Sequence, residues 1–346
     1  MIEKVITNEN EWSDIVNKFQ NNDVYFEYSY YKSFSILGND KPQLFYFCSD
    51  QGKVAYPYML RKIDLRTSSS QYFDISTVYG YGGPLFELST TGNLSLLQEE
   101  FEKVFKENCI NSNIIAQFDR FHPLLKNHEF FSRYEEVTLN RETITIDLTD
   151  QNQIWGNIHP KRKNLIRKSL KNDIHCVIDD RKETLNDFIE IYYETMKINE
   201  ADDYYFFKNE FFEVSQELLG KKLVICNAYK DDEIICSILV LVSDNYLHYY
   251  LSGTRAMYKS LQPNSLLLYE IAKWGNNIGK KFFHLGGGVS SEKDSLYRFK
   301  KSFNRKETAE NNFYIGKRIH NLEVYTHLCD VLDKDKNSNF FPAYRG

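Results

Sequence analysis

The feature that most constrains this 346-residue chain is an order of structural elements that occurs twice. In each half, two stretches with helical patterns precede a pair of long apolar runs joined by a short polar turn, at residues 43–63 and 222–243. Apolar runs joined in this way predict β-hairpins. Each pair is followed by a loop, a stretch with helical periodicity and a short apolar run. The chain is therefore expected to repeat one mixed α/β architecture, although the halves share no detectable residue identity.

The length and composition of the chain favour two globular domains. A chain of 346 residues exceeds the size at which single cores stop growing, and a hydrophobic content of 42% is enough to build two. The 25 Tyr and 25 Phe occur in alternating contexts that suit half-buried strands. The most plausible seam lies between Glu135 and Leu148, so we predict an N-terminal domain at residues 1–149 and a C-terminal domain at 150–346.

Charge and terminal sequence exclude several classes. The net charge of −5 gives no chain-wide footprint for nucleic acid, so DNA is not an expected partner and anion binding must come from local clusters. The first residues lack the apolar core of a signal peptide, and no apolar run is long enough to span a membrane, so a cytoplasmic protein is expected. The six cysteines show no metal-ligand spacing, so we expect buried thiols and no metal site.

Three consecutive glycines, Gly286, Gly287 and Gly288, follow a strand expected to end at Leu285. Glycine lets the backbone approach a ligand closely and adopt positive φ, the conditions for an anion-binding nest of amides. A tight connection from this strand to a helix starting near Asp294 explains the same residues. The glycines alone favour the two interpretations equally.

The helix after the glycines carries a lysine on its apolar face. The spacing i, i+3, i+4, i+7 puts on that face Leu296, Phe299, Lys300 and Phe303. Lys300 should therefore point inward, whereas Arg298 and Lys301 should point away. Such a lysine either extends its amine past its apolar neighbours to water or directs it into a cleft at a substrate. The helical pattern alone favours the first alternative.

A basic helix is predicted near residue 161. Its cations are Lys161, Arg162, Lys163, Arg167, Lys168 and Lys171. In an acidic protein such a cluster indicates a phosphate-bearing partner, and a solvated helix face is the alternative. Asn164 and Arg167 flank the apolar positions and are the better candidates for directed contacts.

The chain shows no motif for nucleophilic catalysis. Ser252 and Gly253 lack the G-x-S-x-G strand-to-helix elbow, and the histidines show no paired spacing. His284, next to the glycines, is more typical of a core residue than of a base.

Several segments together resemble the Fem-type aminoacyltransferases and their Fem-like GNAT relatives. The segments are DISTVYGYGGPLF, HPKRKNLIRKSLKNDI, YYETMKINEADDYYFF, PNSLLLYEIAKWGNNIGKKFFHLGGG, DSLYRFKKSFN and FFPAYR. The resemblance spans nearly the whole chain and implies two tandem GNAT domains, with the transferase cleft in the C-terminal one. It also implies transfer of an acyl or aminoacyl group to an amine. The family's Phe-Lys pair, whose lysine is thought to stabilise the reacting carbonyl, matches Phe299 and Lys300.

The chain also departs from its relatives. The segment KINEADDYYFF is acidic where enzymes acting on lipid-linked precursors tend to be basic, and the coiled-coil arm of some members is missing. The segment SGTRAMYKSLQPNS lacks the R/Q-x-x-G-x-G/A loop that seats the pyrophosphate of CoA in ordinary GNAT enzymes. The acyl donor is therefore either acyl-CoA or aminoacyl-tRNA, and no permanently bound cofactor is expected.

The resemblance and the residues together predict a transferase acting on a nucleotide- or lipid-linked precursor of peptidoglycan or a surface polysaccharide. Lys300 and nearby backbone amides would stabilise charge on the reacting carbonyl. Substrate-binding candidates are Lys32, Lys161, Arg162, Asn164, Arg167, Tyr250 and Phe299; Lys32 would contact the acceptor and the residues from Lys161 to Arg167 would hold phosphates. A non-catalytic binding or scaffold protein, or a simple acetyl-CoA-dependent N-acetyltransferase, is the alternative.

Overall fold

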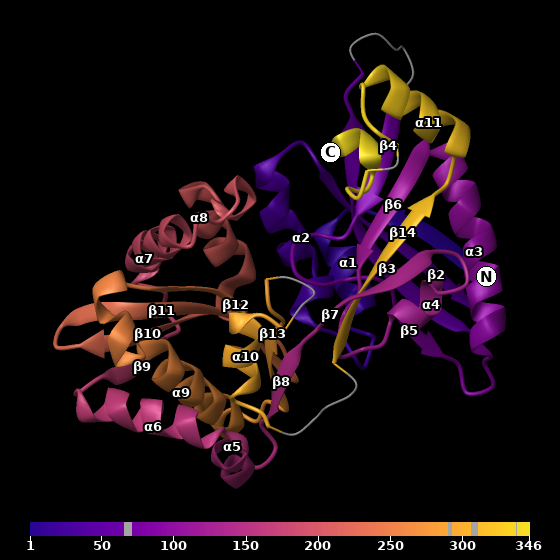
Figure 1. Ribbon diagram of the computed structural model, residues 1–346. Helices are drawn as coiled ribbons and strands as arrows, with labels where there is room; N and C mark the ends of the chain where they lie inside the picture. The colour runs from indigo at the N-terminus through magenta and orange to yellow at the C-terminus, as the bar shows by residue number, and fades with distance from the viewer. Residues whose placement is uncertain (66–70, 290–292, 306–310, 337) are drawn as a thin grey trace. The chain divides into compact units, whose positions relative to one another are not determined.

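The computed structural model describes residues 1–65, 71–289, 293–305, 311–336 and 338–346 (Figure 1). The chain divides into two compact units. The first unit comprises Met1–Asn140 and Asn312–Gly346, and the second comprises Arg141–Asn311. Each unit is built around a mixed β-sheet, so the fold is of the predicted α/β class with mixed sheets.

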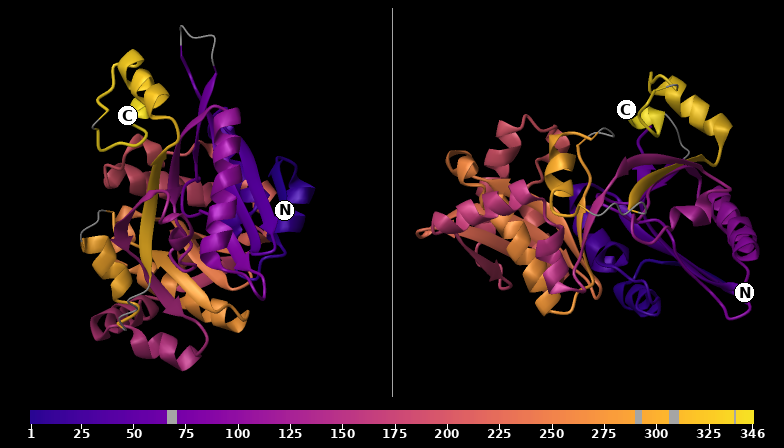
Figure 2. Two further views of the ribbon diagram at one scale, coloured as in Figure 1. Left: turned by 90° about the vertical axis from the view of Figure 1, so that its right-hand side faces the viewer. Right: turned by 60° about the horizontal axis from the view of Figure 1, so that its bottom comes forward.

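The first unit has its sheet in the order β1-β2-β3-β4-β6-β14-β7, with β5 beside β3. Its elements are β1 (Ile2–Ile6), α1 (Glu9–Val16), α2 (Tyr28–Phe34), β2 (Lys41–Ser49), β3 (Gly52–Ile63), β4 (Tyr72–Ser76), β5 (Leu85–Leu88), α3 (Leu94–Asn111), β6 (Ile114–Arg120), α4 (His128–Phe131), β7 (Glu136–Glu142), β14 (Asn312–Ile319) and α11 (Leu322–Val331). Helix α3 buries Phe101 and Phe105 against Phe45 and Tyr56 of the sheet. Figure 2 shows the yellow strand β14 running among the purple strands of this unit.

The second unit has its sheet in the order β8-β13-β12-β11-β10-β9. Its elements are β8 (Ile144–Asp147), α5 (Gln151–Asn157), α6 (Pro160–Lys171), β9 (His175–Asp179), α7 (Leu185–Ile198), α8 (Asn209–Leu219), β10 (Leu223–Lys230), β11 (Glu233–Val242), β12 (Tyr246–Thr254), the 3₁₀ helix η5 (Ala256–Leu261), α9 (Pro263–Asn277), β13 (Phe282–Gly286) and α10 (Ser295–Lys301). Helix α9 covers one face of the sheet with α5 and α6 against it, and α7 and α8 cover the other face (Figure 1).

The predicted repeat of architecture is confirmed. In the first unit the order, with the additional strand β5 between β4 and α3 left aside, is α1, α2, β2, β3, β4, α3, β6; in the second it is α7, α8, β10, β11, β12, α9, β13. The strand directions correspond as well, because β4 is antiparallel to β3 and parallel to β6, while β12 is antiparallel to β11 and parallel to β13. Both units thus contain one parallel strand pair connected through a helix.

The units differ from the expected ranges 1–149 and 150–346. Strand β8, which was expected at the end of the first domain, forms a ladder with β13 of the second unit. Residues 312–346 were expected in the second domain, yet β14 forms a ladder with β6 of the first unit. The reason is strand pairing between segments far apart in the chain, which local sequence patterns do not reveal.

Two further expectations concern membranes and thiols. None of the helices in the described ranges combines the length and the apolar composition that crossing a membrane requires. The cysteines have free thiols: Cys109, Cys226, Cys236 and Cys329 are buried, and Cys48 and Cys176 are partly buried.

Candidate functional site

The parallel strands β12 and β13 of the second unit part after three pairs of residues. They pair from Tyr246 with Phe282 to His248 with His284, and β12 then continues to Thr254 along β11 alone. Beyond His248, no described residue of β13 pairs with β12. The two strands therefore form a fork with an open side on β12.

The corresponding strands of the first unit stay together. Strands β4 and β6 pair up to Ser76 and Phe118, the amide of Thr77 donates to the Phe118 carbonyl at 3.2 Å, and Gly82 bridges to Phe121 further along. Within the described residues, it is therefore the strand pair of the second unit, β12 and β13, that opens into a fork. This difference makes the second unit the candidate for ligand binding between strands.

Tyr250 lies at a β-bulge on the open part of β12. Leu239 of β11 is opposite Leu251 and Val240 is opposite Tyr249, so the register of the ladder shifts at Tyr250. A β-bulge turns the backbone groups of the extra residue away from the regular ladder direction. Tyr250 was predicted to bind substrate, and its bulge lies one residue past the start of the open segment; the binding role stays a prediction.

Lys300 of α10 lies at the point where β12 and β13 separate. Its Nζ donates a 2.7 Å hydrogen bond to the carbonyl of Gly287, directly after β13, and lies 5.3 Å from the ring centroid of Tyr249 on β12. The residue is only 7% exposed, while Arg298 is exposed and Lys301 is half-buried. The predicted inward orientation is confirmed. The alternative prediction, that the side chain extends its amine to water, is wrong, because the amine is buried between Gly287 and Tyr249.

The surroundings of Lys300 change its protonation. The pKa of Lys300 is lowered to about 7, mainly by burial; charge repulsion from Arg141 contributes to the lowering, and Asp294 opposes it. At neutral pH the amine therefore exists in both protonation states. Such a group can donate a charge-assisted hydrogen bond and can also release a proton.

The glycines pack against charged residues that come from elsewhere in the unit. Gly286 has φ +72°, a conformation that favours glycine. A Cβ at Gly287 would lie 2.7 Å from the carbonyl oxygen of Glu142, and one at Gly288 would lie 2.5 Å from Asp294 Oδ1. The glycines themselves are thus closely packed, as a tight connection would require, whereas residues 290–292 of the connection lie outside the described residues. The carbonyls of this loop accept from cations, and binding of an anion by its amides stays a prediction.

Arg162 of the basic helix α6 is engaged inside the protein. Its Nη1 donates to Ser265 Oγ at 2.7 Å, its Nε donates to Ser302 Oγ at 2.9 Å, and its guanidinium lies 4.5 Å from the ring centroid of Phe299. Burial lowers the pKa of Arg162 from its usual value. Arg162 and Phe299 thus join α6, α9 and α10, and a phosphate contact would have to share this guanidinium.

The other predicted phosphate contacts of α6 face outward. Lys161, Asn164 and Arg167 are exposed, and Arg167 donates to Asn164 Oδ1 at 3.1 Å. The guanidinium of Arg167 lies 5.4 Å from the ring centroid of Trp155. Lys32 is exposed on α2 and belongs to the first unit. The second unit therefore brings together Lys300, Phe299, the glycines and Tyr250 near the fork, with Lys161, Asn164 and Arg167 on a separate helix face.

Residues 160–301 match the family described as the acetyltransferase (GNAT) domain. This range runs from the start of α6 to the end of α10 and includes β12, β13 and Lys300. The solved structure of FemX is similar to the whole chain, with a TM-score of 0.69 and 12% identity over 94% of this chain and 99% of FemX. This chain therefore has a tandem GNAT fold, and the fold is similar to that of FemX.

Two further solved structures share this fold. L-PGS from Bacillus licheniformis has a TM-score of 0.56 and 10% identity over 94% of this chain and 96% of its own. The C-terminal domain of a putative lysylphosphatidylglycerol synthetase from Agrobacterium fabrum has a TM-score of 0.52 and 11% identity, over 92% of this chain and 94% of its own. No curated protein matched the chain.

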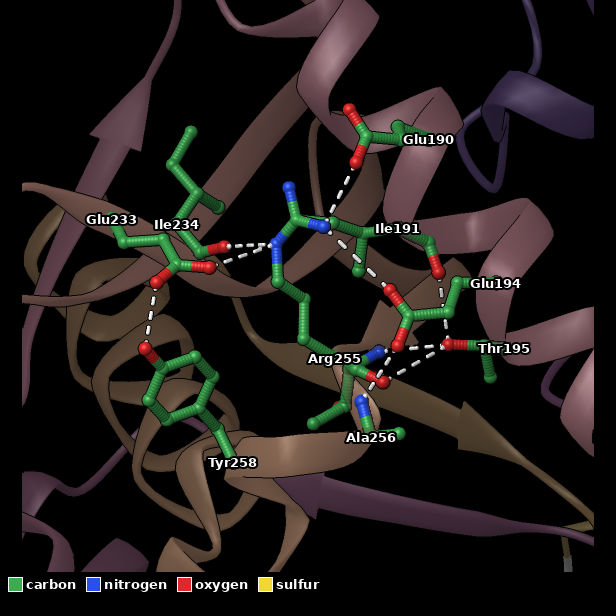
Figure 3. Close-up of polar contacts among 10 residues, drawn as sticks. Glu190, Ile191, Glu194, Thr195, Glu233, Ile234, Arg255, Ala256 and Tyr258 are labelled. Atoms are coloured by element: carbon green, nitrogen blue, oxygen red, sulfur yellow. Dashed lines mark hydrogen bonds and ion pairs between the residues drawn. The ribbon is translucent and has the colours of Figure 1, made fainter.

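The loop after β12 in this second GNAT unit is bonded within the protein. Arg255 lies among three carboxylates, with distances of 2.8 Å to Glu190, 3.6 Å to Glu194 and 3.3 Å to Glu233 (Figure 3). Glu194 also accepts a 2.8 Å hydrogen bond from the backbone amide of Ala256, the first residue of η5. The Ala256 amide at the start of the loop is thus bonded to the Glu194 carboxylate. Three carboxylates surround the single Arg255 guanidinium.

Sequence reasoning missed Arg141, Glu142, Asp294 and Tyr297 as parts of this site. Asp294 is the N-cap of α10, its Oδ1 accepting from the Tyr297 amide at 2.7 Å, and an aspartate before an apolar helical stretch could have revealed it. Arg141 and Glu142 carry no local signal, because they reach the glycine loop from the distant strand β7.

Proposed function

We propose that this chain is a transferase that moves an acyl or aminoacyl group to an amine of a cell-envelope precursor. The observation that carries the proposal is the fork between β12 and β13 with the Lys300 amine at its apex. An extended donor can lie along the open edge of β12 and place its carbonyl near this amine. A binding protein would not need a buried lysine whose protonation changes near neutral pH.

The reaction would be an attack of the acceptor nitrogen on the donor carbonyl carbon. The C–N bond forms, the bond from carbon to the ester oxygen or thioester sulfur breaks, and the leaving group takes up a proton that the amine gives up. Negative charge develops on the carbonyl oxygen. The protonated form of Lys300 would stabilise it, together with nearby backbone amides. No residue is required as a base if the amine arrives neutral.

An aminoacyl ester of tRNA fits the loop after β12 better than acyl-CoA does. Binding a diphosphate there would require free amides at the start of η5 and α9. The Ala256 amide donates to Glu194, the Tyr258 and Ser265 amides donate to nearby carbonyls, and Pro263 has no amide hydrogen. The three carboxylates around Arg255 would also repel a diphosphate. The exposed cations of α6 are better placed to meet the phosphates of RNA.

The acceptor is proposed from the neighbours of this fold. FemX, L-PGS and the C-terminal domain of the putative lysylphosphatidylglycerol synthetase share it, and the last name denotes synthesis of lysylphosphatidylglycerol. A nucleotide- or lipid-linked envelope precursor bearing an amine is therefore the substrate class that we propose. The role of Lys32 as an acceptor contact stays a prediction from the sequence.

The test is a transfer assay with the purified chain. Labelled aminoacyl-tRNA and labelled acetyl-CoA are each offered with nucleotide-linked and lipid-linked precursors that carry a free amine, and products are identified by mass spectrometry. We expect an amide product from aminoacyl-tRNA and a large loss of it in Lys300→Met. Native mass spectrometry of protein from its host should show an RNA or precursor adduct. Absence of any amide product with every donor would reject the transferase in favour of a binding protein.

A further inference from the structure

Arg141, near the end of β7, holds the loop that follows β13. Its Nη1 donates to the carbonyl of Gly288 at 2.7 Å and to the carbonyl of Val289 at 2.8 Å. Its Cδ lies so close to Gly287 that a Cβ there would approach to 2.8 Å. The side chain of Arg141 thus contacts three consecutive residues of the loop. One of them, Gly287, carries the carbonyl that accepts from Lys300.

The same short stretch also holds α10. Glu142 accepts a 2.6 Å hydrogen bond from the Tyr297 hydroxyl and lies 3.1 Å from Lys293 Nζ. The hydroxyl bond is the main cause that lowers the pKa of Glu142. On the other side of the loop, Asp294 Oδ2 accepts from the Val289 amide at 2.7 Å. Arg141 and Glu142 therefore tie the loop and the helix that carries Lys300 to one strand end.

We propose that Arg141 is a positioning residue for Lys300. It would act in two ways: its hydrogen bonds place the loop whose Gly287 carbonyl receives the Lys300 amine, and its positive charge acts directly on that amine. The proposal rests on the proposed function for its catalytic meaning, because Lys300 is taken as the group that meets the donor carbonyl. The geometric relationship needs no substrate and lies within the second unit, because the division between the units falls inside β7, between Asn140 and Arg141.

The charges around Lys300 allow the two effects to be separated. Arg141 on β7 and Asp294 at the start of α10 act on the amine with opposite signs, and the ring of Tyr249 faces it from β12. Glu142 and Lys293 form an ion pair in the same cluster. Removing the Arg141 charge removes the repulsion and leaves the attraction of Asp294, so the amine should hold its proton to higher pH. A lysine at position 141 would keep the charge but lose the planar guanidinium that bonds two carbonyls.

The experiment compares the wild-type protein with Arg141→Gln and Arg141→Lys. Lysines are labelled with ¹³C at Cε, the Lys300 signal is assigned by its loss in Lys300→Met, and its chemical shift is followed by NMR from pH 5 to 11. We expect the wild-type midpoint near neutral pH, a clear move to higher pH in Arg141→Gln and little move in Arg141→Lys. Arg298→Gln, which removes an exposed charge from the same helix, is the matched control and should leave the midpoint in place.

Turnover then reports the second effect. Both Arg141 variants should lower kcat more than they raise KM, because the loop carbonyls lose their partner. In Arg141→Gln the pH dependence of kcat should also move with the NMR midpoint. An unchanged midpoint in Arg141→Gln would overturn the proposal, and so would a move in Arg141→Lys or Arg298→Gln as large as the one in Arg141→Gln. If the midpoints behave as expected but no donor and acceptor pair yields an amide, the proposed function is wrong while the role of Arg141 stands.

Discussion

The amine of Lys300 and the carbonyl oxygen of Gly287 are joined by a hydrogen bond of 2.7 Å. The bond connects α10 to the end of β13 at the place where β13 has left β12. A charged amine in a buried site needs an acceptor, and here the backbone supplies it. A donor carbonyl that enters the fork would offer a second oxygen to the same amine.

Lys300→Met should lower kcat strongly while the protein stays folded. Removing one stabiliser of a developing oxyanion costs about 2.7 to 4 kcal/mol, or roughly a hundred- to a thousandfold in turnover. Methionine keeps the apolar stem in place. Steady-state transfer rates and melting temperature check this, with the half-buried Lys301→Met as the control. Equal turnover in both variants would mean that Lys300 has no catalytic role.

The free energy of unfolding should depend on pH through Lys300. Its pKa is lowered from 10.5 to about 7 in the folded protein, mainly by burial. Between these values the unfolded chain binds one more proton, so stability rises with pH across this window. Lys300→Met should remove this rise, which urea unfolding at pH 7 and pH 9.5 would measure. A rise as steep as that of the wild-type protein would show that Lys300 is not the group responsible.

A buried carboxyl pair in the first unit should act in the opposite direction. Burial raises the pKa of Asp119 to about 6 and also raises that of Glu135. Because the folded value of Asp119 lies above its ordinary value of 3.8, its contribution is present at low pH and is lost as pH rises through about 6.

Asp119→Asn should therefore flatten the dependence of the urea midpoint on pH between about 4 and 7. Asparagine can keep an acceptor for the Tyr56 hydroxyl, which bonds Asp119 at 2.9 Å. Asp14→Asn, at an exposed position of the same unit, is the control and should follow the wild-type curve. If Asp119→Asn also follows that curve, the carboxyl pair does not govern the dependence.

The basic helix α6 should separate into structural and binding residues. Arg162→Ala leaves Ser265 and Ser302 without their charged partner and should lower the free energy of unfolding by about 2 kcal/mol. Lys161→Ala with Arg167→Ala should leave unfolding nearly unchanged. This double variant should raise KM for the anionic donor at low salt, and the difference should shrink as salt rises.

The control for α6 is Lys103→Ala with Lys106→Ala, which removes two exposed charges from α3 of the first unit. Unchanged KM in the α6 double variant at low salt would identify the helix face as merely solvated. A rise in KM equal to that of the α3 variant would indicate a general charge effect.

Local pattern was sufficient for the two hairpins, for the repeated order of elements and for the orientation of Lys300. The spacing from Leu296 to Phe303 gives one buried face on any helix, and the structure places Lys300 there. The hairpins and the repeat followed from apolar runs with polar turns. These features depend on residues that are close together in the chain, so they can be predicted from one sequence.

The partners of Lys300 depend on contacts between distant segments. The bonds from Arg141 to Gly288 and Val289 join β7 to a loop after β13, and β14 returns to β6 from the end of the chain. Arg162 was predicted to face a phosphate from its charge, yet Ser265 and Phe299 take up its guanidinium. Residue type indicates charge, whereas only tertiary packing decides whether that charge meets solvent, substrate or another side chain.

Gly288→Ala tests whether the glycine loop positions α10. The new Cβ would lie 2.5 Å from Asp294 Oδ1, so the carboxylate must move away from the Tyr297 and Val289 amides that it caps. Loss of an N-cap costs about 1 kcal/mol, and kcat should fall because α10 carries Lys300. Calorimetry and transfer rates check both effects.

Gly156→Ala in α5 is the control: its Cβ would meet nothing within 4 Å, so it should stabilise the helix by about 0.5 to 1 kcal/mol. If Gly288→Ala retains both melting temperature and turnover, close packing is not the reason for glycine at this position.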